Sequence, residues 1–317
     1  MATRASMDTK IAILLAVLLS FAASPSRSRL SFDFYVTSCP AVEFIVSNTV
    51  RSVSSSDPTI HGKLLRLLLH DCFVEISSDI GKRNREKRSG KYFSSEDSRS
   101  SIRLNGNSKS SALEAFLVLV ALAARDAVVL AGGPAFPIPT GRRDEEYRML
   151  QNVRLIIADT SFTTNEMIEL FKSKGLSLDD LVTLSVGSAH CNAFSDRFRM
   201  DLKGKLTLID KSLDCSYAEH LMKKCSSDSS ASKTVDNDLE TFAFDNQYYS
   251  NLVAHKGLFQ SDSVLIEDGR TREKVEAFAN DQESFFMSWG DSFLKLTSIG
   301  VKTDDEGEIR RSCSFAN

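Results

Sequence analysis

The segment Leu64–Val74, with the sequence LLRLLLHDCFV, constrains the fold and the function of this chain more than any other stretch. Its five leucines surround one arginine and one histidine, and this apolar density indicates a buried helix. In a helix, Arg66 and His70 stand at positions i and i+4 and lie on the same face. That pairing suits a site where His70 acts as a base and Arg66 stabilises developing negative charge. The alternative is a core helix in which Arg66 and His70 have hydrogen-bond partners and no catalytic role.

The composition favours an all-α protein with a sizeable core. The chain has 317 residues, of which 42% are hydrophobic, and its formal net charge is −3. This charge gives no reason to expect a nucleic acid or an acidic membrane surface as a partner. Proline occurs only six times, which fits long helices. Periodicity and capping signals predict helices over 41–53, 64–74, from 112 onwards, 164–175, 178–185, 242–259, 271–279 and 285–299, with at most one short hairpin.

Residues 1–28 have the sequence pattern of a signal peptide. Arg4 and Lys10 form a basic start, and the apolar run from Ile11 to Ala23 is followed by small residues. This run is too short to cross a bilayer comfortably, and no later stretch is apolar enough to do so. We therefore expect a secreted, extracellular and monomeric protein without a membrane segment.

Secretion makes the six cysteines plausible disulfide partners, and six cysteines allow 15 connectivities. A rival interpretation is a metal site formed by Cys191, Cys215, His220 and Cys225, although these spacings match no paired Cys-x-x-Cys pattern. Residues 75–111 contain many basic residues and serines and few large apolar residues, so we expect a long loop or a disordered insert there.

Nine motifs in sequence order resemble the plant secretory (class III) haem peroxidases. They are FDFYVTSCP, LLRLLLHDCFV, LVALAARDAVVLAGGP, PTGRRD, LDDLVTLS, AHCNAFSDRF, FDNQYYSNL, GLFQSDSVL and GEIRRSC. The resemblance implies a single domain over 29–317, with two helical halves that enclose haem b, two structural calcium ions and four disulfides. It also implies oxidation of phenolic and other small reductants by hydrogen peroxide. Arg66 and His70 match the family's distal arginine and histidine, which stabilise charge and transfer the peroxide proton.

The resemblance further implies calcium ligands. Asp71 and the carbonyl of Val74 match the start of the distal site, but the chain then reads EISSDIG where the family has a Gly-Cys-Asp-x-Ser segment. The other distal ligands and the cysteine partner of Cys72 are therefore missing. Asp238, Thr241 and Asp245 resemble the ligands of the proximal site, in a segment that is one residue short. Calcium is thus expected at the proximal site rather than at the distal one.

The chain departs most from the family at the haem-iron ligand. Leu184 to Cys191 reads LSVGSAHC, four residues shorter than the family's motif, and the ligating histidine is among those lost. His190 matches the family's second histidine and is the surrogate candidate for the iron. Asp262 matches the aspartate that orients the ligating imidazole. Cys191 with Cys225 is the family bridge that survives whole. The alternative to an active peroxidase is a catalytically impaired or non-haem scaffold protein that keeps only the distal half of the site. Shifted exon boundaries in the gene model would explain such a sequence.

Overall fold

The computed structural model describes residues 30–74, 116–143, 160–191, 194, 196–200, 206–225, 234–236, 243–303 and 306–307. The described helices are α2 (Val42–Ser54), α3 (Ile60–Val74), α5 (Phe116–Leu130), α7 (Thr164–Ser173), α8 (Leu178–Leu184), α9 (Cys215–Cys225), α10 (Gln247–Val253), α11 (Gln260–Glu267), α12 (Gly269–Asn280) and α13 (Gln282–Leu296). The strands are β1 (Ser188–His190), β2 (Phe198–Met200), β3 (Leu206–Leu208) and β4 (Thr234–Asp236). Helices dominate, which confirms the all-α prediction. The expected signal peptide and the segment 75–111 lie outside the described residues.

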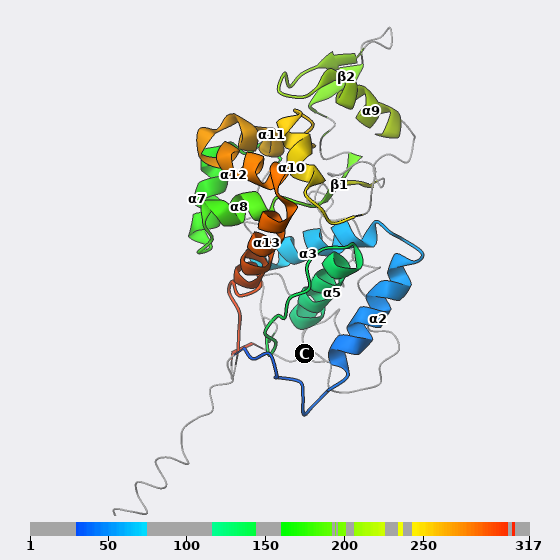
Figure 1. Ribbon diagram of the computed structural model, residues 1–317, viewed down its shortest axis with the longest axis vertical. Helices are drawn as coiled ribbons and strands as arrows, with labels where there is room; N and C mark the ends of the chain where they lie inside the picture. Colours follow the sequence, from blue (N-terminus) through cyan, green and yellow to red (C-terminus); the bar gives the residue numbers. More distant parts are fainter. Residues whose placement is uncertain are drawn as a thin grey trace, which may run out of the picture.

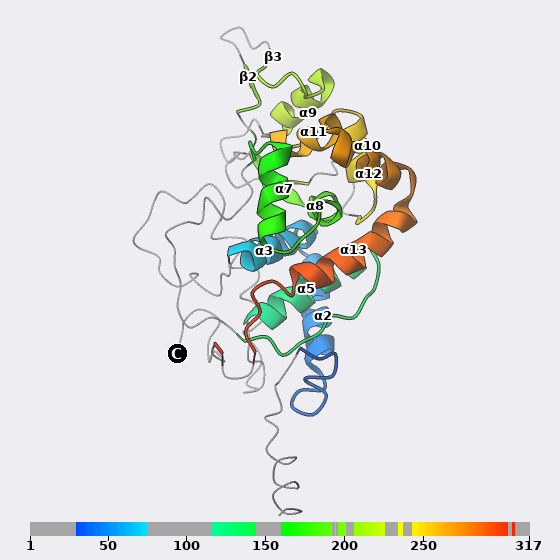
Figure 2. The same cartoon turned by 90° about the vertical axis from the view of Figure 1, so that its left-hand side faces the viewer.

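One half of the fold packs around α5. This helix is apolar except for Arg125 and Asp126, and its side chains are buried from Val118 to Val128, as expected for a helix without a solvent face. The helices α2 and α3 both pack against it. Figures 1 and 2 show α3 lying between α5 on one side and α7 and α8 on the other. The face of α3 that is turned away from α5 is therefore the place where a site between the two halves can form.

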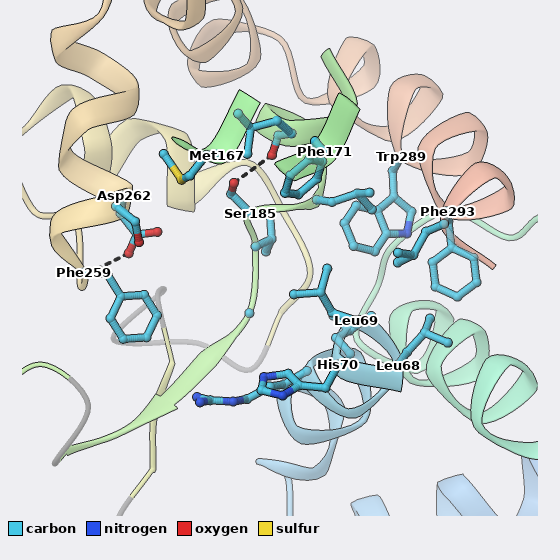
Figure 3. A pocket seen from close by; sticks show the side chains of 18 of the residues that line it. Leu68, Leu69, His70, Met167, Phe171, Ser185, Phe259, Asp262, Trp289 and Phe293 are labelled. Atoms are coloured by element: carbon cyan, nitrogen blue, oxygen red, sulfur yellow. Dashed lines mark hydrogen bonds between the residues drawn. The ribbon is translucent and has the colours of Figure 1, made fainter. Parts of the chain in front are cut away.

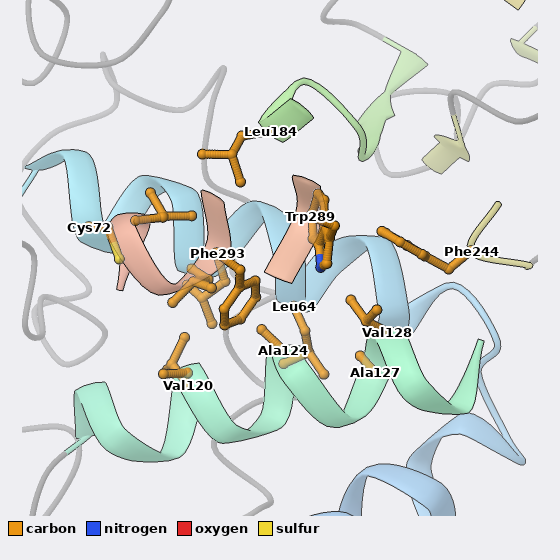
Figure 4. Packing of buried hydrophobic residues seen from close by; sticks show 14 of the residues in the cluster. Leu64, Cys72, Val120, Ala124, Ala127, Val128, Leu184, Phe244, Trp289 and Phe293 are labelled. Atoms are coloured by element: carbon orange, nitrogen blue, oxygen red, sulfur yellow. The ribbon is translucent and has the colours of Figure 1, made fainter. Parts of the chain in front are cut away.

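The other half contains α7, α8 and α10 to α13. Asp180 joins two of these helices, because its buried carboxylate accepts the backbone N–H of Ser177, the N-cap residue of α8, and also hydrogen bonds from Ser292 and Lys295 of α13. Trp289 and Phe293 of α13 extend the same core towards the first half. Figure 4 shows them together with apolar side chains of α3 and α5.

Two short antiparallel strand pairs lie beyond α8, where the sequence predicted at most one hairpin. β1 pairs with β4 and β2 pairs with β3. Near them, Cys191 and Cys225 form a disulfide with an S–S distance of 2.04 Å, which confirms this bridge. The rival metal site at these cysteines is therefore wrong, since two of its four ligands are bonded to each other. Cys39 and Cys72 are buried thiols and Cys215 is an exposed one.

Within the part of the chain that is described, the helices are either too short or too polar to cross a membrane.

Candidate active site

Arg66 and His70 line the same cavity, as the helical spacing predicted. The cavity has a volume of about 140 Å³ and lies between α3, α7, α8, α13 and the start of α11. His70 is only 4% exposed and Arg66 is half-buried. Figure 3 shows His70 on one wall, Ser185 and Phe171 on another, and Asp262 with Phe259 on a third. Most of the remaining wall is apolar and includes Leu69, Met167, Leu181, Leu184, Trp289 and Phe293.

Asp262 contributes a buried carboxylate to this cavity. It sits in the first turn of α11, where its Oδ2 accepts the backbone N–H of Phe259 at 2.8 Å. Its Oδ1 accepts the hydroxyl of Tyr248 at 2.9 Å. Burial raises the pKa of Asp262 to about 6, against the opposing effects of Phe259, Tyr248 and Arg197. The site thus combines an imidazole and a guanidinium on α3 with a carboxylate of raised pKa on α11.

The shortened segment after α8 forms part of the cavity wall. Ser185, Val186 and Gly187 line the cavity, and β1 begins at the next residue. The backbone of His190 pairs with that of Thr234 in this strand. The side chain of His190 lies outside the description, so its assignment as an iron ligand stays a prediction.

Comparison with known proteins shows the family of this chain. The family model described as peroxidase matches residues 46–281. The chain belongs to the peroxidase family. It is 54% identical to Peroxidase 46 of Arabidopsis thaliana over 312 residues, covering 95% of this chain and 96% of the relative. It is 53% identical to Peroxidase 18 of the same plant over 327 residues, covering 98% of both proteins. It is also 34% identical to Peroxidase 55, again from Arabidopsis thaliana, over 317 residues, with 96% and 95% covered.

These relatives confirm the resemblance to the plant haem peroxidases and support a peroxidase enzyme. Because identity of this level extends over nearly the whole chain, the alternative of a non-haem scaffold is not favoured.

The lining of the cavity is chemically suited to a largely apolar group such as haem. Aromatic and aliphatic side chains make up most of the lining, while the ionisable side chains of Arg66 and His70 come from α3 and that of Asp262 comes from α11. The apolar space is therefore bounded by Arg66 and His70 on the α3 side and by Asp262 on the α11 side. Among the lining side chains that are described, His70 and Met167 carry the nitrogen and sulfur donors that bind haem iron in proteins. Neither belongs to α11.

The predicted calcium ligands of this peroxidase fall only partly within the described residues. Asp71 is 2% exposed near the end of α3, and Val74 is the last residue of that helix. Asp245 accepts the backbone N–H of Gln247 at 2.9 Å, which stabilises the start of α10. Asp238 and Thr241 lie outside the described residues. No group of three metal-binding side chains occurs in the described part of the chain, and the calcium sites stay predictions.

Two residues near the site were missed by sequence reasoning. Tyr248 was seen only as part of a family motif, although its hydroxyl holds the Asp262 carboxylate. Trp289 was assigned no role, although it lines the cavity. The partners Tyr248 and Asp262 are 14 residues apart on different helices. No local spacing rule predicts such a contact.

Proposed function

We propose that this peroxidase is a secreted enzyme that binds haem b in the cavity of α3 and uses hydrogen peroxide to oxidise phenolic or other small reductants. The observation that carries the proposal is that Arg66 and His70, one turn apart on α3, both line an apolar cavity that also holds a buried carboxylate. A base and a fixed cation in a largely water-free site are what cleavage of a peroxide O–O bond requires.

The chain's own residues would handle the proton and the charge. His70 takes a proton from one oxygen of hydrogen peroxide and delivers it to the other oxygen, which departs as water. Arg66 stabilises the negative charge that grows as the O–O bond breaks, because its guanidinium is charged at every physiological pH. Haem, when bound, supplies the iron that receives the oxidising equivalents. The apolar wall excludes water, which strengthens the electrostatic effect of Arg66.

His190 is our candidate for the nitrogen ligand of the haem iron. Its backbone lies three residues beyond Gly187, which lines the cavity. Asp262 would orient the imidazole, since metal-binding histidines usually donate their second N–H to a carboxylate or carbonyl.

The test is haem reconstitution of the expressed chain. A histidine-ligated Soret spectrum together with guaiacol oxidation supports the proposal, and failure to take up haem rejects it. His190→Ala should lose this spectrum, whereas His220→Ala, which changes an exposed histidine of α9, should keep it. An unchanged spectrum in His190→Ala would remove His190 as the ligand.

Calcium belongs to the same proposal. Asp238, Thr241 and Asp245 would supply oxygen ligands at the proximal site, and Asp71 and Val74 would contribute to a weaker distal one. Metal analysis of the purified protein should find calcium, and a chelator should lower its melting temperature. An equal melting temperature with and without chelator, and no calcium in the purified protein, would reject both sites. Secretion as a monomer is tested by following a tagged chain to the medium and measuring its mass in solution.

A further inference from the structure

Tyr248 and Tyr249 are neighbouring buried tyrosines whose hydroxyls meet very different acceptors. The two rings are in edge contact with centroids 5.0 Å apart, and they are 2% and 0% exposed. The hydroxyl of Tyr248 donates to the Asp262 carboxylate at 2.9 Å. The hydroxyl of Tyr249 donates to the backbone carbonyls of Val182 and Thr183, each at 3.2 Å.

This difference decides which ring can be oxidised. A phenol that loses an electron becomes a very strong acid, so its oxidation is easy only where a base can accept the proton. A carboxylate can take up a proton, whereas a backbone carbonyl cannot do so at ordinary pH. The Asp262 carboxylate is 4% exposed and its Oδ1 accepts the Tyr248 hydroxyl directly, so the proton of Tyr248 has an acceptor at hydrogen-bond distance.

We propose that Tyr248 and Asp262 form a proton-coupled redox pair that holds one oxidising equivalent as a neutral tyrosyl radical. This inference rests on the proposed function, because the oxidant is the equivalent that hydrogen peroxide leaves in the cavity. Tyr248 gives one electron to the oxidised site, its O–H bond breaks, and the proton passes to Oδ1 of Asp262. When a reductant returns an electron, the proton moves back and the tyrosine is restored.

Asp262 itself lines the cavity, and a chain of aromatic rings also connects the cavity to the Tyr248–Asp262 pair. Trp289 lines the cavity, its ring centroid is 6.0 Å from that of Phe285, and Phe285 is 5.0 Å from Tyr249. The indole Nε1 of Trp289 is buried and has no hydrogen-bond partner among the described residues. Its proton therefore has no acceptor in the part of the chain that is described, and an electron vacancy on Trp289 would pass on to Tyr248, where the proton can leave.

The experiment compares Tyr248→Phe with the matched control Tyr249→Phe. Haem uptake is recorded first, and the loaded proteins are then mixed with hydrogen peroxide in the absence of a reductant and frozen for electron paramagnetic resonance. The wild type and Tyr249→Phe should show a tyrosyl radical, which ring-deuterated tyrosine narrows. Tyr248→Phe should lose this signal. A signal that survives in Tyr248→Phe, or that vanishes equally in both variants, would overturn the proposal.

A haem-independent measurement separates this inference from the proposed function. If the chain takes up no haem, the proposed function fails, and the same proteins are oxidised instead with flash-generated ruthenium(III). The radical should again form at Tyr248 and be lost in Tyr248→Phe. Asp262→Asn keeps an oxygen acceptor but removes the base, so it should also lose the radical while circular dichroism stays native. A radical of full yield in Asp262→Asn would overturn the role of the carboxylate as the proton acceptor.

Discussion

Replacing Asp262 with asparagine should change how the stability of this peroxidase depends on pH. The side chain is 4% exposed, and burial raises its pKa from the ordinary 3.8 to about 6. A carboxyl with a higher pKa in the folded chain contributes its full stability below about pH 4 and loses it as the pH rises through about 6. A pKa difference of one corresponds to about 1.4 kcal/mol, so the wild type loses roughly 3 kcal/mol across this window. Asparagine does not titrate and avoids this loss.

Urea unfolding of the haem-free proteins, followed by circular dichroism from about pH 4 to about pH 7, measures this effect. The free energy of unfolding of Asp262→Asn relative to the wild type should rise by about 3 kcal/mol over this range, whatever offset the lost hydrogen bonds cause. Asp268→Asn is the control that should run parallel to the wild type, because hydrogen bonds from Arg270 lower the pKa of Asp268 to about 2 and this carboxyl titrates below the measured range. Parallel pH curves for Asp262→Asn and the wild type would refute the reasoning.

Asp180→Ala should lower the free energy of unfolding by about 3 kcal/mol, because it removes the carboxylate half of the α8 capping box and leaves a buried serine hydroxyl of α13 without its acceptor. Asp179→Ala, which removes an exposed ion pair, should cost less than about 1 kcal/mol in the same urea titration, and equal costs would contradict the role of the Asp180 carboxylate. The double variant Cys191→Ser/Cys225→Ser, which opens a bridge between residues 34 apart, should lose about 3–4 kcal/mol. Cys215→Ser, at an exposed thiol, should change the midpoint little, and an unaffected double variant would show that the bridge adds no stability.

The parts of the site that the sequence predicted depend on local spacing. Arg66 and His70 share a helix face because they are four residues apart, and the apolar run of α5 predicted a core helix for the same reason. The contact of Asp180 with Lys295 joins residues 115 apart in the sequence, so no periodic pattern indicates it. The pairing of β1 with β4 is equally non-local, because its strands are three residues long and far apart in the chain.

The environment of the Asp262 carboxylate is likewise set by non-local contacts that the sequence does not indicate. Sequence reasoning selected Asp262 through its match to the family motif, and the residue does line the cavity. Its acceptor role for Tyr248 and its raised pKa arise from packing between α10 and α11. Only the folded chain brings these two helices together.

The claim that Arg66 and His70 form the peroxide site is tested most directly by the stopped-flow rate at which the haem-loaded protein reacts with hydrogen peroxide. His70→Leu should bind haem as the wild type does and react about 10²- to 10⁴-fold more slowly, the usual contribution of a positioned base. His61→Leu is the matched control on the same helix, because the His61 ring contacts Ser54 at 2.9 Å and is not among the residues that line the cavity. A wild-type rate in His70→Leu would contradict the proposed site.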